Sequence, residues 1–303
     1  KRAVSMMSFA TMLWLFAFKI KKIQGYDRVI IQTPPLPVAG SAITLFKKIF
    51  GRKTLVNISD LWPLSAVELG AMREGGKIYD IFAWIERYIY RNADGIFGQS
   101  EEIIRHVNQF PSTKNKFVYR NLQQYAVAAQ PKRKHTPFRI VYAGLLGVAQ
   151  DIYSIIENIP FQSIGAEFHL YGGGNQAEKI KEYINKHPGC FVYYHGYVKK
   201  EQIAEELSRY DASIVPLTVA IKGAVPSKIY DLIPIGIPIL FCGGGEGAEI
   251  VSKYYFGMVS KPHDFKQLHN NIIELINLPD EEYSTISKNC LDMAKNEFDF
   301  NKQ

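Results

Sequence analysis

Short apolar runs alternate with amphipathic segments along most of the chain. The runs typical of strands lie at residues 28–32, 54–58, 95–98, 116–119, 138–143, 167–171, 191–194, 212–216 and 238–242. Between them lie segments with the 3.6-residue period of helices, the longest at residues 77–91 in the first half. Because alternating strands and helices form parallel sheets, the pattern predicts an α/β fold with doubly wound domains.

The alternation is interrupted at residues 122–137. This stretch is polar and ends in the proline-bounded run PKRKHTP, which is typical of a surface connection between domains. At 303 residues, the chain is long enough for two hydrophobic cores. We therefore predict two domains, residues 1–130 and 131–303.

An apolar run at residues 3–18 precedes the first strand and has basic residues on both sides. Three interpretations are open: a helix packed on the core of its domain, a helix partly exposed to lipid, and a membrane-spanning helix, although the run is shorter than the roughly 20 apolar residues of a span. The chain begins with Lys1, and its first strand follows this helix. We therefore expect a longer protein whose N-terminal part is missing, which leaves the first domain incomplete.

The formal net charge of +7 suits phosphate-bearing ligands, nucleic acid or an anionic membrane. The lysines and arginines are scattered and do not form a patch with aromatic residues, so nucleic acid is not an expected partner. The three cysteines are widely spaced and form no CxxC motif, which argues against a zinc site and a disulfide framework. This cysteine usage favours a reducing cytoplasm.

Residues 226–231 (PSKIYD) combine a cation and a carboxylate in a short helix. Pro226 suits the start of a helix because a proline lacks the N–H that would be unpaired there. Ser227 and Lys228 then lie beside the free amides of the first turn, which attract anions, and Asp231 follows one turn later on the same face. An ammonium for phosphate and a carboxylate for sugar hydroxyls are what a nucleotide-sugar requires.

Two glycines, Gly144 and Gly147, lie between a predicted strand and a predicted helix. The absence of side chains there allows the backbone to approach a phosphate, although a simple strand-to-helix turn explains the same glycines. The sequence contains neither the dinucleotide fingerprint GxGxxG nor the P-loop motif GxxxxGK[ST]. These two kinds of nucleotide site are therefore not expected.

Four further polar residues follow predicted strands or turns, and each has a structural alternative to a ligand contact. Asp60 ends a strand of the first domain, where an aspartate also stabilises turns. Ser100 precedes a helix and is either its cap or a ligand contact, and a lone histidine such as His195 is more often structural than catalytic. Glu246 opens a helix, where an acidic residue suits the helix dipole with or without a ligand.

With these residues in place, the chain resembles the family 4 glycosyltransferases, which are retaining enzymes with the GT-B fold of two Rossmann-like domains facing a cleft. The resemblance is closest to enzymes of bacterial surface polysaccharides such as O-antigen, capsule and exopolysaccharide. It rests on residues 226–231 followed by residues 236–238 (GIP), which are similar to the PSK-x-x-E and G-x-P segment of that subgroup. The supporting motifs lie at residues 60–63, 142–147, 172–174 and 195–198.

This resemblance implies a donor site in the second domain. Lys228 and the amides of residues 144–147 would hold the diphosphate of a nucleotide-sugar, and Asp231 would bind its ribose hydroxyls. The backbone of Tyr197 and Val198 would lie near the base. The donor-binding residues that we expect are Gly144, Gly147, Tyr197, Val198, Ser227, Lys228, Asp231 and Glu246.

The resemblance also implies an acceptor and a location. Asp60 would act with Lys228 at the reacting sugar, and Ser100 would contact the acceptor, a lipid-linked saccharide. The transferred group would be a hexosyl or N-acetylhexosaminyl residue, and the reaction would require no metal or other cofactor. The enzyme would lie on the inner face of the cell membrane, in peripheral contact with anionic lipid.

Three departures from the family pattern leave two alternatives open. The family commonly has two glutamates spaced by seven residues; Asp231 takes the second place, and Gly223 takes the first. The frequent cleft histidine has no counterpart at Ser59 and Asp60, and the glycine-rich loop after the first strand is missing. The alternatives are a nucleotide-sugar epimerase of the same fold and a non-catalytic nucleotide-sugar-binding protein.

Overall fold

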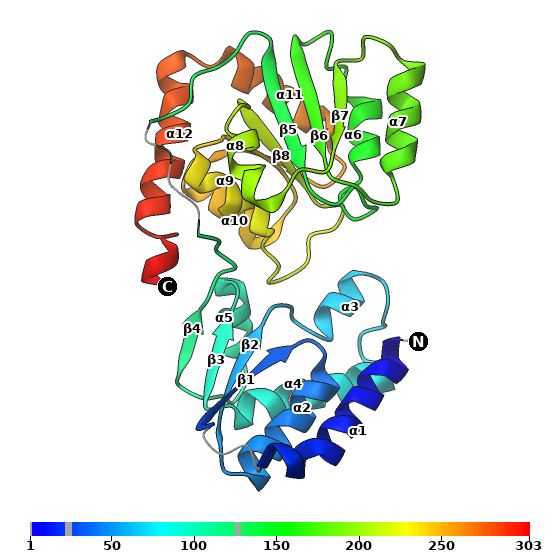
Figure 1. Cartoon of the computed structure of the whole chain (residues 1–303), viewed down its shortest axis with the longest axis vertical. Coiled ribbons are helices and arrows are strands. Elements are labelled where there is room, and N and C mark those ends of the chain that lie inside the picture. Colours follow the sequence, from blue (N-terminus) through cyan, green and yellow to red (C-terminus); the bar gives the residue numbers. More distant parts are fainter. Residues whose placement is uncertain (1, 22–25, 125–127, 129) are drawn as a thin grey trace. The chain divides into compact units, whose positions relative to one another are not determined.

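The structure, a computed structural model, describes residues 2–21, 26–124, 128 and 130–303. Contacts within it divide the chain into two compact units (Figure 1). The first is Lys1–Arg120 with Ile221–Val225, and the second is Asn121–Ala220 with Pro226–Gln303. This division falls before the predicted boundary at residue 130, and it assigns a short segment of the second half to the first unit.

The first unit is built on a four-stranded parallel sheet. Its strands, in their order across the sheet, are β1 (Arg28–Thr33), β2 (Lys53–Ile58), β3 (Gly95–Gly98) and β4 (Lys116–Val118). The helices are α1 (Arg2–Lys21), α2 (Leu36–Ile43), the π-helical η1 (Thr44–Ile49), α3 (Leu64–Glu68), α4 (Lys77–Asn92) and α5 (Glu101–Val107). Each strand is added on the same side of the one before it, so the order never reverses. The double winding predicted for this domain is therefore not present in the described residues.

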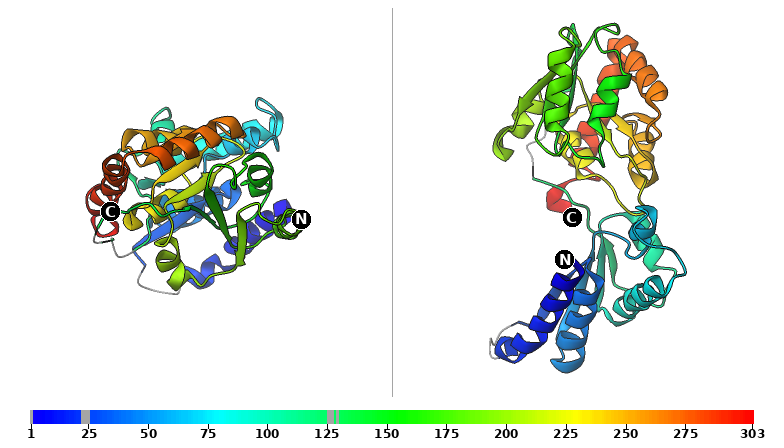
Figure 2. Two further views of the ribbon diagram at one scale, coloured as in Figure 1. Left: turned by 90° about the horizontal axis from the view of Figure 1, so that it is seen from above. Right: turned by 90° about the vertical axis from the view of Figure 1, so that its right-hand side faces the viewer.

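Helix α1 contains the apolar run for which three interpretations were open. It lies alongside α2 (Figure 2). Ala10 is buried, and the indole nitrogen of Trp14 donates to the Ser41 hydroxyl at 2.6 Å. Large apolar side chains elsewhere on α1 are exposed, among them Leu15 (72%) and Phe9 (57%). In the described part of the chain, no helix is both long and apolar enough to cross a membrane. The flanking basic residues 1 and 22 lie outside the described residues.

The segment Ile221–Val225 is held in the first unit through Gly223. The Glu102 carboxylate accepts a hydrogen bond from the Gly223 amide at 2.7 Å, and the Ser100 hydroxyl donates to the Gly223 carbonyl at 2.8 Å. Gly223 has a φ of +79°, and a Cβ there would come within 2.8 Å of a side-chain carbon of Ile103. This close packing requires glycine and gives a physical reason why residue 223 departs from the glutamate of the family pattern.

The second unit is built on a six-stranded parallel sheet in the order β10-β9-β8-β5-β6-β7. Its strands are β5 (Phe138–Ala143), β6 (Ala166–Tyr171), β7 (Val192–Gly196), β8 (Ala212–Pro216), β9 (Ile239–Cys242) and β10 (Gly257–Ser260). The order reverses between β5 and β8, so this sheet is doubly wound as predicted. Strand β10 was not predicted, because its four residues are too few to show an apolar run typical of a strand. Pairing with β9, from Gly257 opposite Ile239 onward, makes this segment a strand.

Helices complete the second unit. They are α6 (Ile152–Asn158), α7 (Ala177–Lys186), η2 (Lys200–Gln202), α8 (Ile203–Leu207), α9 (Ser227–Leu232), η3 (Ile233–Ile235), α10 (Gly245–Lys253), α11 (Phe265–Asn277), α12 (Asp280–Lys295) and η4 (Phe300–Lys302). Residues of α6, α7, α11 and α12 pack with the strands in one large apolar cluster. In a doubly wound sheet, ligands bind at the carboxyl ends of the strands beside the reversal of strand order. That position is where the candidate site lies.

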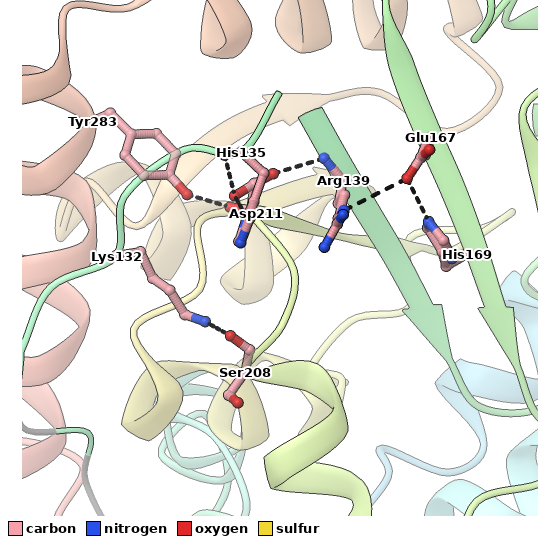
Figure 3. Close-up of polar contacts among 8 residues, drawn as sticks. All are labelled: Lys132, His135, Arg139, Glu167, His169, Ser208, Asp211 and Tyr283. Atoms are coloured by element: carbon pink, nitrogen blue, oxygen red, sulfur yellow. Dashed lines mark hydrogen bonds and ion pairs between the residues drawn. The ribbon is translucent and has the colours of Figure 1, made fainter. Parts of the chain in front are cut away.

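The chain entering the second unit is fastened to it through Asp211 (Figure 3). The Asp211 side chain is fully buried and accepts hydrogen bonds from the amides of His135 at 3.0 Å and Arg139 at 2.7 Å. The Nδ1 atom of His135 lies 2.7 Å from the same carboxylate, and the Tyr283 hydroxyl donates to the Asp211 carbonyl at 2.7 Å. The end of the predicted connection is therefore attached to the second unit at His135. Residues 125–127 and 129 of the connection lie outside the described residues.

Candidate functional site

A cavity of about 440 Å³ lies in the second unit at the carboxyl ends of β5 and β6. An adjoining cavity of about 50 Å³ shares Asp231 with it and adds Lys228. The larger cavity is lined by Ala143, Gly144, Leu145, Tyr171, Gly172, Gly173, Tyr197, Val198, Lys200, Ile203 and Asp231. The structure thus brings together five residues that the sequence singled out: Gly144, Tyr197, Val198, Lys228 and Asp231.

Glycines make the room for the polar side chains at this site. Gly144 has a φ of +152°, and a Cβ there would lie 2.5 Å from the Lys228 Cε. A Cβ on Gly172 would lie 1.9 Å from the Gly144 carbonyl oxygen, and one on Gly173 would lie 2.1 Å from the Tyr197 hydroxyl. The missing side chains therefore allow the turns after β5 and β6 to pack together and allow Lys228 and Tyr197 to take their positions.

The backbone amides of the first turn are partly used inside the protein. The Gly144 amide donates to the Tyr171 carbonyl at 2.9 Å, and the Leu146 amide donates to the Gly173 carbonyl at 2.9 Å. The prediction that the amides of residues 144–147 bind phosphate therefore does not hold for these two donors. Gly144 instead contributes the space that Lys228 occupies.

Replacing Gly144 with alanine is expected to displace Lys228 and weaken nucleotide binding by at least tenfold. The new methyl group would overlap the lysine side chain, and the backbone conformation at residue 144 is one that residues with a side chain rarely adopt. Titration calorimetry with uridine and guanosine diphosphates measures the loss of affinity. Gly165→Ala is the matched control, because Gly165 also has a positive φ (+68°) but has open space around its missing side chain. Equal affinities of the two variants would contradict this role of Gly144.

For both charged residues of helix α9, Lys228 and Asp231, burial and the charge of the other residue shift the pKa in opposite directions. Burial lowers the pKa of Lys228, and the negative charge of Asp231 opposes that shift. Burial raises the pKa of Asp231 to about 6, although Lys228 and Lys200 act in the opposite direction. The Oδ1 atom of Asp231 is buried and has no hydrogen-bond partner among the described residues. Because an unsatisfied carboxylate oxygen is costly in a folded protein, this atom is suited to receive the hydroxyl of a ligand.

The rim of the larger cavity is aromatic and basic. Tyr197 is 83% exposed, so its ring offers a face to a planar ligand, and Val198 follows it. Three residues that line this cavity were not predicted as site residues from the sequence: Tyr171, Lys200 and Ile203. Tyr171 ends the strand before the three glycines, which was a usable signal, whereas Lys200 and Ile203 reach the cavity only because η2 and α8 fold back over it.

Three predicted donor-binding residues do not line either cavity. Gly147 lies in the turn after β5, and Ser227 is the first residue of α9. Glu246 is 3% exposed, in the first turn of α10, where the positive end of the helix dipole favours it. His195 has a structural role, as the alternative to catalysis proposed: its Nε2 lies 2.9 Å from the Nδ1 of His169, and the two rings stack in parallel.

Asp60 and Ser100, the two predicted residues of the first domain, differ in their surroundings. Asp60 follows β2, and partial burial raises the pKa of its carboxyl group. Ser100 is fully buried and is the N-cap of α5, where its hydroxyl oxygen accepts from the Ile103 amide at 3.1 Å while its hydrogen bonds to Gly223. The cap therefore accounts for Ser100, and an acceptor would find no exposed part of this side chain.

Metal coordination has no candidate cluster in the part of the chain that the structure describes: no three His, Cys, Asp or Glu side chains there are grouped closely enough to hold an ion. The cations at the site are instead the side chains of Lys228 and Lys200.

Residues 137–278 match the profile of the family described as Glycosyl transferases group 1. This part of the chain is a group 1 glycosyltransferase domain. The domain contains every residue that lines the two cavities, together with the α9 helix. A search of curated proteins found no match to the chain.

Solved structures resemble both the group 1 glycosyltransferase domain and the unit before it. HepE from Anabaena in complex with UDP has a TM-score of 0.71 at 14% identity, over 97% of this chain and 79% of that one. The lipopolysaccharide outer core galactosyltransferase WaaB has a TM-score of 0.63 at 17% identity, over 99% and 82%. S. aureus TarM in complex with UDP has a TM-score of 0.62 at 18% identity, over 93% and 55%, so the chain spans about half the length of TarM. These likenesses show a GT-B type of fold with Rossmann-like units.

Proposed function

We propose that the protein transfers a hexosyl or N-acetylhexosaminyl residue from a nucleoside diphosphate sugar to a saccharide acceptor, with retention of configuration. The observation that carries this proposal is the buried, unpartnered oxygen of Asp231 beside Lys228, in a cavity with the exposed ring of Tyr197 at its rim. A carboxylate for ribose hydroxyls, an ammonium for diphosphate and a ring for the base match the three parts of a nucleotide. The group 1 glycosyltransferase domain supports sugar transfer, and the UDP and UDP-glucose complexes of HepE support uridine as the base.

Lys228 has the main chemical role in this proposal. The bond between the sugar C1 and the diphosphate oxygen breaks, and a bond forms between C1 and an acceptor hydroxyl oxygen on the same face of the ring. The hydroxyl proton passes to the departing diphosphate. The Lys228 ammonium stabilises the negative charge that develops on that leaving group, and electrostatic stabilisation of this kind is usually the largest single contribution to catalysis. Asp60, with its raised pKa after β2, is the proposed contact for the reacting sugars.

A lipid-linked acceptor on the inner face of the cell membrane, as in bacterial surface-polysaccharide assembly, is the second part of the proposal. Helix α1 supports this part: Phe9, Met12, Leu15 and Phe16 are exposed on it, and the exposed Lys19 follows them in the sequence. Exposed apolar side chains next to basic ones suit the interface of an anionic bilayer.

The experiment that tests this function uses the full chain with UDP-sugars labelled in the sugar, with and without a lipid extract that contains lipid-linked saccharides. We expect label to enter the lipid fraction and UDP to be released in equal amount only when the extract is present. GDP-sugars, used in parallel, are expected to be inactive. Transfer from GDP-sugars alone would contradict uridine as the base, and transfer to water-soluble saccharides alone would contradict the lipid-linked acceptor.

The same experiment separates the two alternatives. Conversion of the donor into its epimer without any acceptor would identify an epimerase. Binding of UDP without release of UDP from any UDP-sugar would identify a non-catalytic binding protein. That alternative arises because Gly223 takes the place of the first glutamate of the family pattern. Either result would contradict the proposed transfer.

A further inference from the structure

Tyr142 lies beneath the candidate site without lining either cavity. It is the residue before the last of β5, and its side chain is fully buried. Its hydroxyl donates to the Leu145 carbonyl at 2.6 Å, inside the turn that follows the strand. Its ring faces the Lys228 ammonium, whose Nζ lies 5.4 Å from the ring centroid. One buried side chain therefore contacts both the glycine turn and the cation of the site.

The contact with Tyr142 compensates the Lys228 ammonium for hydration that it loses on burial. A lysine ammonium on a flexible stem is strongly hydrated in water, and here it is drawn into a partly buried position over Gly144. Asp231 is the charged group that faces it from α9, and Lys200 acts in turn on Asp231. The electron-rich face of an aromatic ring attracts a cation within about 6 Å of its centroid, most strongly when water is excluded. The ring of Tyr142 thus replaces part of the lost hydration.

We propose that Tyr142 is a positioning residue: its ring holds the Lys228 ammonium where the diphosphate binds, while its hydroxyl fixes the turn that leaves space for the lysine. The inference rests on the proposed function for the identity of the ligand. Tyr142 begins the motif at residues 142–147 that supports the family resemblance, but that resemblance gives the tyrosine no role, and a tyrosine in a buried strand has the pattern of a core residue.

The test compares two side chains of nearly equal shape at residue 142, phenylalanine and 3,4,5-trifluorophenylalanine. Both lack the hydroxyl, so both lose the bond to Leu145, but fluorine withdraws the electron density that attracts the cation. Acylation of Lys228 by acetic anhydride, followed by mass spectrometry of its peptide across pH, reports the lysine pKa in the free protein. We expect the midpoint of the trifluoro variant to lie about one pH unit below that of Tyr142→Phe, because the two variants differ only in the electron density of the ring.

Calorimetric titration with UDP at pH 8 supplies the functional readout. We expect the trifluoro variant to bind UDP about three- to tenfold more weakly than Tyr142→Phe. Identical acylation profiles and identical UDP affinities in the two variants would overturn the role of Tyr142. Failure of the wild-type protein to bind UDP would instead contradict the proposed function, so the two failures are distinguished.

Discussion

Replacing Lys228 with methionine is expected to lower kcat/KM for the nucleotide-sugar by about 10²- to 10³-fold. Methionine has a similar length and can still pack over Gly144, but it gives the diphosphate no counter-charge. Burial lowers the pKa of Lys228, which means that the folded protein disfavours the charged form. Removing the charge is therefore not expected to lower the free energy of unfolding, so that urea unfolding can separate lost activity from lost stability.

Lys266→Met is the matched control for this variant. Lys266 is exposed on α11 in the same unit, so the substitution removes the same charge at a distance from the cavity. Donor turnover in the presence of acceptor and urea unfolding are measured for both variants. Turnover of Lys228→Met within threefold of Lys266→Met would contradict the assignment of Lys228 to the diphosphate.

Replacing Asp231 with asparagine is expected to stabilise the protein at pH 7.5 and to weaken UDP binding by about 10- to 100-fold. Burial raises the pKa of Asp231 from 3.8 to about 6, so the ionised carboxylate is less stable in the folded protein than in the unfolded chain. That difference corresponds to about 3 kcal/mol as an upper value. Asparagine removes the cost, but a ribose hydroxyl then loses a charge-assisted hydrogen bond of about 1.5–3 kcal/mol.

The stabilisation has a defined pH dependence. Below about pH 3.8 the carboxyl group is protonated in both the folded and the unfolded state, so it carries no penalty. Between about pH 3.8 and about pH 6 the unfolded chain ionises this carboxyl group while burial keeps it protonated in the folded protein, so wild-type stability falls across that range. The advantage of Asp231→Asn should therefore grow between pH 4 and pH 6 and stay constant above.

Urea unfolding at pH 4.5 and pH 7.5 measures this dependence, and calorimetry measures UDP affinity. Asp292→Asn, at an exposed position of α12, is the control for the loss of one carboxylate. A variant less stable than wild type at pH 7.5 would show that Asp231 is not a destabilised carboxylate, and a variant that binds UDP equally well would show that Asp231 is not a ligand.

Local features of the sequence were sufficient to predict the core of the site. Pro226 fixes the start of α9, so Lys228 and Asp231 had to lie on one face, and the structure confirms this arrangement. The strand before Gly144 was equally clear, because buried parallel strands are short apolar runs bounded by glycine. The strand before Tyr197 lies at the edge of the sheet; it was predicted at residues 191–194 and ends two residues later. A doubly wound sheet then brings their carboxyl ends together, which is a rule of topology and needs no further sequence signal.

Features that depend on contacts distant in sequence could not be predicted. The bonds from Ser100 and Glu102 to Gly223 join residues more than 120 positions apart, and nothing local distinguishes this use of Ser100 from an ordinary cap. The order of the first sheet is likewise set by which strand edges meet. Lys200 became a cavity residue only through the packing of η2, and the same holds for Tyr142, whose partner Lys228 lies on another element.

The central claim is that the carboxyl end of the second sheet binds the diphosphate and ribose of a nucleotide-sugar through Lys228 and Asp231. The most direct measurement is calorimetric titration of UDP into the wild-type full chain and into Lys228→Met at pH 7.5. We expect saturable binding of one UDP per wild-type chain and at least a tenfold loss of affinity in the variant. No binding to the wild-type chain, or equal binding to both proteins, would contradict it.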